Sequence, residues 1–233
     1  MKNDAAPAAV DDDANVALAA AAHEIKNALG PLAMTLQLAE RQAQGGKPVA
    51  PADLAFARAQ VRRLSALVDD LLDQTRADLG KLAFRPRPAD LGAVVAEAVE
   101  TFRRGKPASI AVERPPAPLT AAVDAGRVQQ VIVNLLENAI RYSPAGSEVE
   151  VRLRESAPGR ARIEVSDRGP GLSSEEQARI FDRFVRGAAS EGTSGLGLGL
   201  YLCRAIVEQH GGTIGVDSAP GAGATFWVEI RTG

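Results

Sequence analysis

The sequence has little of several residue types, and each scarcity excludes a class of protein. A single cysteine in 233 residues rules out an intrachain disulfide, so the chain is not a disulfide-stapled secreted domain. Aromatic residues make up only 4% of the chain, and the net charge of -2 argues against nucleic acid as the main partner. No apolar run approaches the roughly 18 residues that cross a bilayer, so we expect no membrane contact from this segment. Asp11, Asp12 and Asp13 interrupt the first residues, and we expect no secretory signal there.

Two long helices with matching apolar repeats are predicted at the start of the chain. The first runs from about Asp13 to Gln44, the second from about Pro51 to Gly80, and a glycine- and proline-containing break separates them. Their apolar residues alternate at spacings of 4 and 3, and are Leu18, Ala22, Ile25, Leu29, Leu32, Leu36 and Ala39, then Leu54, Ala57, Val61, Leu64, Val68 and Leu71. This pattern predicts an antiparallel helical hairpin. One hairpin has too little core to stand alone, so we expect a homodimer with a four-helix bundle.

From Asp90 onward the pattern mixes amphipathic helices with short alternating strands. Helices are predicted at about 91–102, 124–142, 173–184 and 199–210, and strands at 109–112, 148–154, 161–166, 213–216 and 225–230. Pro86 and Pro88 block a helix just before this region, which is therefore a linker or an edge strand. The fold class is thus α+β: the hairpin, then an α/β sandwich whose helices lie on one face of a mixed, mostly antiparallel sheet.

His23 is one of only two histidines and lies one residue off the apolar seam of the first helix. At that position it faces outward on a rigid helix, where a large partner can reach it. Glu24 is adjacent and can orient the imidazole or take its proton. Asn27 follows four residues after His23, so it shares the same helix face and can position a water. A lone surface histidine is also commonly just a solvated side chain, and this segment alone leaves both interpretations open.

A second polar stripe lies on the helix predicted at 124–142. Asn134, Asn138 and Tyr142 recur every four residues, with Arg141 beside them. Amide oxygens, a cation and an aromatic ring suit a metal-bound nucleotide, because Mg²⁺ takes few protein oxygens and keeps its waters and phosphates. A solvated helix face is the alternative for the same residues.

Two glycine-containing segments follow. Asp167 comes directly after a strand and can accept a hydrogen bond from an adenine amine, while Gly169 and Gly171 let backbone approach a base closely. The segment 192–199 leads into a helix, and glycines that expose backbone N–H groups at a helix N-terminus make an anion site. The segment is neither a Walker-type loop nor a dinucleotide fingerprint. The segment between Phe184 and Gly195 is rich in glycine, alanine and serine, and we expect it to be mobile, like a lid.

Five strings, taken in order, resemble the transmitter core of the two-component sensor histidine kinases. They cover the chain from about Asp13 to Arg231 and are His23-Glu24-Ile25-Lys26-Asn27, Asn134-Leu135-Leu136-Glu137-Asn138, Asp167-Arg168-Gly169-Pro170-Gly171, Ile180-Phe181-Asp182-Arg183-Phe184 and Gly195-Leu196-Gly197-Leu198-Gly199. The resemblance implies a disordered lead-in at 1–12, a dimerisation and histidine phosphotransfer domain at 13–80, a linker at 81–89 and a catalytic domain with a Bergerat-type ATP-binding fold at 90–233. Where the family usually has proline, this chain has Ala28, with Pro31 following.

The resemblance also implies a role for each matched residue. His23 would be the phosphoacceptor, Glu24 the base that activates its ring nitrogen, and Asn27 the residue that orients water for dephosphorylation of a partner. The residues implied in holding ATP and Mg²⁺ are Asn138 as metal ligand, Asn134 in support, Arg141 at phosphate, Tyr142 beside adenine, Asp167 on the adenine amine, Gly169 and Gly171 lining the pocket, and Gly195, Leu196, Gly197 and Gly199 around the phosphates. Phe181 and Phe184 would anchor the lid.

The implied activity is ATP-dependent autophosphorylation on histidine, then transfer to an aspartate of a response regulator receiver domain, with phosphatase activity toward that regulator. We expect a cytoplasmic location, either as a soluble kinase or as the cytoplasmic part of a membrane-bound sensor. Two alternatives stay open: another ATPase or serine kinase with the same nucleotide fold, and a pseudokinase scaffold.

Overall fold

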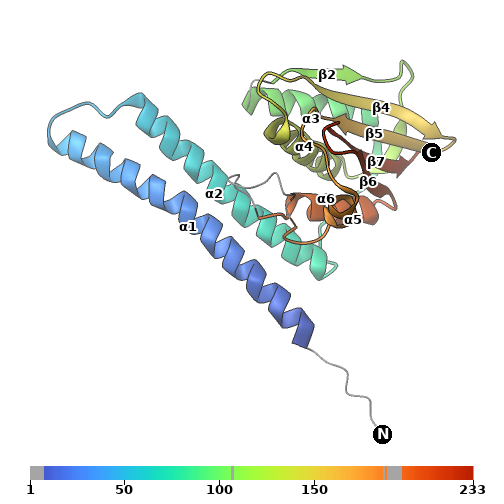
Figure 1. Ribbon diagram of the computed structural model, residues 1–233. Coiled ribbons are helices and arrows are strands. Elements are labelled where there is room, and N and C mark those ends of the chain that lie inside the picture. Colours follow the sequence, from blue (N-terminus) through green and yellow to red (C-terminus); the bar gives the residue numbers. More distant parts are fainter. Residues whose placement is uncertain (1–7, 106–107, 186, 188–195, 233) are drawn as a thin grey trace, which may run out of the picture. The chain divides into compact units, whose positions relative to one another are not determined.

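The computed structural model describes residues 8–105, 108–185, 187 and 196–232, except for the side chains at 8–21, 23, 24, 63 and 70. The chain divides into two compact units (Figure 1). The first contains Met1–Thr75 and Gly192–Leu196, and the second contains Arg76–Glu191 and Gly197–Gly233. Each unit is described by itself.

The first unit is the predicted helical hairpin. Helix α1 spans Ala8–Gln44 and helix α2 spans Pro51–Asp78, and a short turn joins them. Ala28 and Ala57 are buried, so small side chains occupy covered positions on both helices. Helix α1 begins earlier than the expected start near Asp13, which makes part of the expected lead-in helical. Among the described helices, none is both long and apolar enough to cross a membrane.

The second unit is built on a five-stranded sheet with the order β2-β4-β5-β7-β6. The strands are β2 (Ile110–Glu113), β4 (Val149–Ala157), β5 (Arg160–Ser166), β6 (Thr213–Ser218) and β7 (Ala224–Arg231). Strands β2 and β4 pair in parallel, and every other neighbouring pair in this sheet is antiparallel. The mixed, mostly antiparallel sheet expected from the sequence is therefore confirmed.

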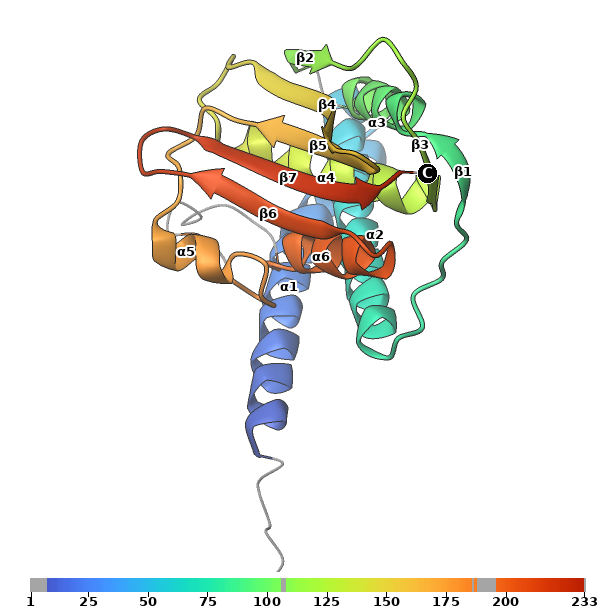
Figure 2. The same cartoon turned by 90° about the vertical axis from the view of Figure 1, so that its right-hand side faces the viewer.

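Three helices cover one face of this sheet (Figure 2). They are α3 (Leu91–Gly105), α4 (Ala125–Tyr142) and α6 (Gly199–Gln209). The apolar residues of each strand alternate with polar ones, so one side of the sheet packs against the apolar stripes of these helices. On α4 the buried stripe is Val128, Val131, Ile132, Leu135, Leu136 and Ala139, as the helical period predicts. The predicted α+β class with helices on one face is confirmed.

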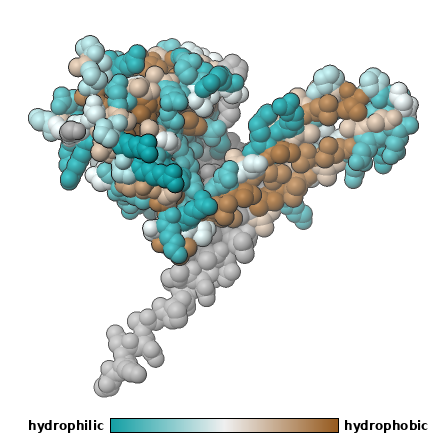
Figure 3. Space-filling model, turned by 180° about the vertical axis from the view of Figure 1, so that it is seen from behind, coloured by the Kyte–Doolittle hydropathy of each residue, from teal (hydrophilic) through white to brown (hydrophobic). Residues whose placement is uncertain are grey.

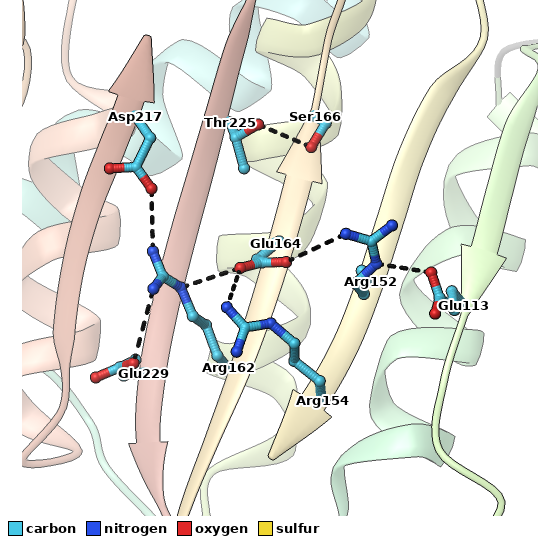
Figure 4. Close-up of polar contacts among 9 residues, drawn as sticks. All are labelled: Glu113, Arg152, Arg154, Arg162, Glu164, Ser166, Asp217, Thr225 and Glu229. Carbon is cyan, nitrogen blue, oxygen red and sulfur yellow. Dashed lines mark hydrogen bonds and ion pairs between the residues drawn. The ribbon is translucent and has the colours of Figure 1, made fainter. Parts of the chain in front are cut away.

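The opposite face of the sheet carries a network of charged side chains (Figure 4). Glu164 on β5 is only 8% exposed and lies at its centre. Arg154 donates to Glu164 at 2.7 Å, and Arg162 lies 3.2 Å from the same carboxylate oxygen. Glu113 accepts from Arg152 at 2.6 Å at the outer edge of the network. Within the sheet, the network pairs Glu164 with Arg154 and Arg162.

Two elements differ from the sequence-based expectations. Strand β3 (Thr120–Val123) was not predicted. It pairs antiparallel with β1 (Arg87–Asp90), so of the two alternatives for the proline-containing region, a linker or an edge strand, the strand is present from Arg87 onward. Helix α5 spans only Ser174–Arg179, whereas a helix to Phe184 was predicted. The capping box that was predicted to begin this helix, Ser173 with Glu176, is present.

Candidate functional site

The polar stripe on α4 lies beside the buried stripe that fixes this helix on the sheet. Asp124 caps the helix, because its side chain accepts from the backbone N–H of Arg127 at 3.3 Å. Asn134, Asn138 and Tyr142 then follow at four-residue intervals and are half-buried, while Arg141 is exposed. A capped and well-packed helix holds these side chains in a fixed row.

Asn134 stands next to the start of α6. A Cβ placed on Gly199, the first residue of α6, would lie 3.8 Å from the side-chain nitrogen of Asn134. That nitrogen is buried and has no hydrogen-bond partner within the described part of the chain. A buried donor without an acceptor is unfavourable unless a ligand supplies one. The structure therefore brings Asn134 of the polar stripe next to Gly199 at the end of the glycine loop.

Asp167 follows β5 directly and is held by backbone groups. Its Oδ1 accepts from the N–H of Gly169 at 2.8 Å and from the N–H of Ala224 at 3.3 Å. Burial raises the pKa of this carboxyl above its usual value, and the two N–H groups oppose that effect. Because both backbone bonds go to Oδ1, Oδ2 is left to receive a ligand N–H group.

The glycines around Asp167 are required by close backbone contacts. A Cβ on Gly171 would lie 2.0 Å from the carbonyl oxygen of Ala219, and one on Gly169 would lie 3.0 Å from that of Tyr142. Gly171 also has a φ of 72°, which favours glycine. The backbone of Tyr142, Asp167 and the two glycines thus lie in one cluster.

The glycine loop leads into the N-terminus of α6. Gly195 falls outside the described residues, Leu196 is buried, and Gly197 adopts a φ of 69°. Gly199 opens the helix, and the residue before it, Leu198, makes no side-chain capping bond. The first N–H groups of α6 are therefore not capped by that side chain, an arrangement that suits the oxygens of a phosphate.

The predicted phosphoacceptor segment lies within α1. The side chains of His23 and Glu24 fall outside the described part of the chain, whereas Asn27 is described and exposed. Ala28 is 0% exposed, so the position where the family usually has proline is a packed one in this hairpin. Pro31 lies inside α1, and Thr35 donates to its carbonyl oxygen at 2.9 Å.

Several residues of the site were not found from the sequence. Ala224 donates to Asp167, and Gly223 is glycine because a Cβ there would lie 2.2 Å from the carbonyl oxygen of Asp167. The hydroxyl of Ser143 accepts from the N–H of Arg168 at 3.2 Å. A sequence feature could have identified Gly223, because it lies in a glycine turn between two predicted strands. Ala224 had no such feature, because it acts through its backbone N–H, and the hydroxyl of Ser143 belongs to no motif in the sequence.

These residues fit an adenine nucleotide. A carboxylate oxygen, close-lying glycines, an unpartnered amide and an uncapped helix N-terminus offer an acceptor for the base and donors for the phosphates. Over the described residues, no group of three histidine, cysteine, aspartate or glutamate side chains could hold a metal ion. A metal here would depend on amide oxygens and on the phosphates, which is the manner in which Mg²⁺ binds with nucleotides.

Comparison with known families assigns both parts of the chain. Residues 123–233 match the family described as "Histidine kinase-, DNA gyrase B-, and HSP90-like ATPase", and residues 15–80 match the "His Kinase A (phospho-acceptor) domain". The fold and the site thus define an ATP-binding domain of the histidine kinase type, joined to a phosphoacceptor hairpin.

Similar proteins place the chain in one family. The signal transduction histidine-protein kinase/phosphatase MprB of Mycobacterium avium (strain 104) is 34% identical over 217 residues, which is 89% of this chain and 41% of that protein. A solved structure of mycobacterial MprB is 30% identical, has a TM-score of 0.58 and covers 63% of this chain and 98% of its own. The histidine kinase AdeS of Acinetobacter baumannii is 26% identical, with a TM-score of 0.67, over 90% of this chain and 97% of its own. The chain belongs to the two-component sensor histidine kinase family and spans less than half the length of its curated MprB relative.

Proposed function

We propose that this chain phosphorylates itself on His23 with ATP and then transfers the phosphoryl group to an aspartate of a receiver domain. The observation that carries the proposal is that α4 lies against both predicted binding segments: Asn134, whose buried side-chain nitrogen has no partner among the described residues, stands beside Gly199, and Tyr142 stands beside Gly169, which donates to Asp167. The phosphoacceptor family match to residues 15–80 supplies the acceptor.

Different residues of the chain bind different parts of the nucleotide. Asp167 takes the adenine amine through Oδ2, with Gly169 and Gly171 giving the base room and Tyr142 beside it. Asn134, Arg141, Gly195, Leu196, Gly197 and Gly199 surround the phosphates. Asn138 would hold Mg²⁺, which neutralises phosphate charge when it is bound.

The transfer needs positioning more than covalent assistance. A neutral ring nitrogen of His23 attacks the γ-phosphorus, the bond between that phosphorus and the oxygen of ADP breaks, and Glu24 takes the ring proton. The phosphoryl group then passes to a carboxylate of the receiver. Asn27, four residues along the same helix, orients the water that hydrolyses the phosphoryl group from the receiver. The name of MprB, a kinase/phosphatase, supports including this second activity.

The exposed apolar residues of the hairpin support a homodimer. On α1 and α2 the apolar repeat has two sides. One side contains residues that are buried or half-buried in the single chain, among them Ala57, Leu64 and Leu71. The other side remains 45–51% exposed and contains Leu29, Leu36, Leu54, Val61 and Val68. Figure 3 shows apolar surface running along the hairpin. A second hairpin laid on this face would complete a four-helix bundle.

A different hairpin face fits the receiver domain. Asn27, Pro31, Met34 and Leu38 follow one another at helical spacing below His23, and all four are exposed. Met34 and Leu38 are apolar and lie away from the dimer side of α1. An exposed apolar pair on the phosphoacceptor's own face suits a partner that must approach His23. We propose that the receiver docks there.

The direct test is radiolabelling from γ-phosphate-labelled ATP. The wild-type chain should take up label that is lost in acid and kept in base, as expected for phosphohistidine. His23→Ala should take up none while still binding ATP, and Glu24→Gln should label slowly. Acid-stable label would instead favour a serine kinase of the same nucleotide fold. A wild-type chain that binds no ATP would favour the pseudokinase scaffold.

A further inference from the structure

Two consecutive residues, Arg183 and Phe184, contact the start of α6 on the side of the glycine loop. The backbone N–H of Phe184 donates to the carbonyl oxygen of Gly197 at 3.2 Å. The guanidinium of Arg183 lies 4.8 Å from the ring centroid of Tyr201 and donates to its hydroxyl at 2.9 Å. We call Arg183 and Phe184 the bracket. It joins the segment after α5 to the loop and to the first turn of α6.

The backbone of the bracket is strained where it meets the loop. Phe184 has a φ of 60°, and it is the only described residue other than glycine with a positive φ. Gly197, its partner, has a φ of 69°, and a Cβ there would lie 2.8 Å from the carbonyl oxygen of Val185. A bulky residue keeps the left-handed conformation only where its surroundings impose it. Close contact between the two backbones is what imposes it here.

The side chains next to this contact are fixed as well. Asp78 accepts a hydrogen bond from the hydroxyl of Tyr201 at 2.7 Å and also pairs with Arg183. The ring of Tyr201 therefore has a cation over its face and a carboxylate at its hydroxyl. Phe181, just before the bracket, packs edge-on against Phe226 of β7 with ring centroids 6.3 Å apart. The bracket is thus anchored on the sheet and on α6.

We propose that Arg183 and Phe184 are positioning residues for the phosphates of ATP: by holding Gly197 and the first turn of α6, they aim the backbone N–H groups that receive those phosphates. This inference rests on the proposed function, in which the glycine loop surrounds the phosphates. The bracket does not reach the adenine end, which is formed by Asp167, Gly169 and Gly171. Its loss should therefore weaken phosphate binding and spare adenosine binding.

The experiment compares ATP with adenosine as competitors for a fluorescent ATP analogue, using the whole chain. Arg183→Ala should weaken ATP about tenfold, the usual effect of losing a positioning interaction to a charged group, and change adenosine less than about twofold. Arg179→Ala is the control, because Arg179 is an exposed arginine in the last turn of α5 and outside the bracket. It should change neither ligand.

A matched pair at Phe184 tests the backbone. Phe184→Gly and Phe184→Pro both remove the ring, but glycine keeps the left-handed backbone and the N–H group, whereas proline can have neither. ATP affinity should fall further in Phe184→Pro than in Phe184→Gly, and in Phe184→Pro it should fall as far as in Arg183→Ala. Circular dichroism shows which variants are folded, and the Phe184 pair carries the test if Arg183→Ala is not.

Two results would overturn the positioning role. Equal losses for ATP and adenosine would mean that the bracket only supports the fold. Unchanged ATP binding in both Arg183→Ala and Phe184→Pro would mean that the loop is held without it. Failure of the wild-type chain to bind ATP is a separate outcome, which would count against the proposed function.

Discussion

At the scale of single residues, Asp167 has a charge that its surroundings disfavour. Burial raises its pKa above the usual value. A carboxyl with a raised folded-state pKa contributes stability that is present below the unfolded pKa and is lost as the pH rises through the folded pKa. Near neutral pH the ionised carboxylate therefore costs folding stability. Such a cost at a ligand-facing acceptor is typical of a functional residue.

Because burial disfavours the charged form of Asp167, the uncharged variant Asp167→Asn is informative. The amide oxygen of asparagine can still accept from Gly169 and Ala224, but its NH₂ group would stand where the adenine amine needs an acceptor. We expect ATP affinity to fall by about tenfold or more, because a buried donor then faces a donor. The midpoint of thermal unfolding without nucleotide should be unchanged or higher than that of wild type. Calorimetric titration and thermal unfolding check both, and a lower midpoint with normal ATP binding would contradict the assignment.

Asn27 allows a second prediction at this scale. It is exposed and lies one helical turn from His23, but it has no acid or base group. Asn27→Ala should keep autophosphorylation within a few-fold and slow loss of phosphate from the receiver about tenfold, as expected when a positioning contact for water is removed. Two time courses measure this: label onto the chain, and label off a purified phosphorylated receiver with ADP present. Equal losses in both would remove the water-positioning role.

At the scale of elements, periodic segments could be predicted from sequence, whereas the pairing of two short strands could not. Helix α4 combines an apolar stripe with an aspartate cap, and both signals agree on its start. Strand β1 is Arg87–Asp90 and strand β3 is Thr120–Val123. Each has four residues and no clear alternation of apolar and polar residue types in the sequence, so their pairing depends on contacts between distant segments.

The same limit applies to the candidate site. Asp167 could be proposed because an aspartate before glycines follows a strand. Arg183 and Tyr201 could not, because their contact joins segments 18 residues apart and has no local pattern. The predicted helix to Phe184 stopped at Arg179, and the left-handed backbone of Phe184 is incompatible with helix at that residue.

The sheet yields a prediction on stability. Glu164 is nearly buried and pairs with Arg154, whose pKa its hydrogen bond raises. Removing it would leave Arg154 without the carboxylate it donates to, so Glu164→Ala should lower the free energy of unfolding by about 2 kcal/mol, less than for a fully buried pair because Arg154 is partly exposed. Glu113→Ala is the control, since Glu113 is exposed at the edge of the same network and should change stability by less than about 1 kcal/mol.

Urea unfolding followed by tryptophan fluorescence measures both variants. Trp227 is the single tryptophan, it pairs with Glu164 in the register of β5 and β7, and Arg162 stacks 4.2 Å from its ring centroid. Its signal therefore reports on this sheet. Similar losses in the two variants would mean that burial does not distinguish the centre of the network from its edge.

At the scale of the whole molecule, the chain combines a phosphoacceptor hairpin with an ATP-binding unit. In a single copy without nucleotide, each of these parts has one unsatisfied feature. The hairpin leaves an apolar face exposed. Within the described residues, the buried side-chain nitrogen of Asn134 in the ATP-binding unit has no hydrogen-bond partner. In the proposed function, a second copy of the chain would cover the apolar face and a nucleotide would supply the acceptor. Assembly and ligand binding should therefore be separable by mutation.

Two leucines on α1 separate dimer formation from receiver docking. Leu36 and Leu38 are almost equally exposed, at 46% and 47%, but they lie about 200° apart around the helix. Leu36 belongs to the apolar repeat, whereas Leu38 shares the face of Asn27 and Met34. Leu36→Glu places a charge on the proposed dimer face, and burying it there without a partner is strongly unfavourable. Leu38→Glu leaves that face unchanged.

Light scattering should therefore give the mass of a dimer for the wild type and for Leu38→Glu, and the mass of a monomer, or aggregate, for Leu36→Glu. Phosphotransfer to a receiver should show the effect of each variant on receiver docking. Leu38→Glu should label itself at the wild-type rate and pass phosphate to a receiver about tenfold more slowly, since a charge on an apolar docking face costs roughly 1–2 kcal/mol. A dimeric Leu36→Glu would refute the proposed dimer face. Normal phosphotransfer by Leu38→Glu would move receiver docking to another face of the hairpin.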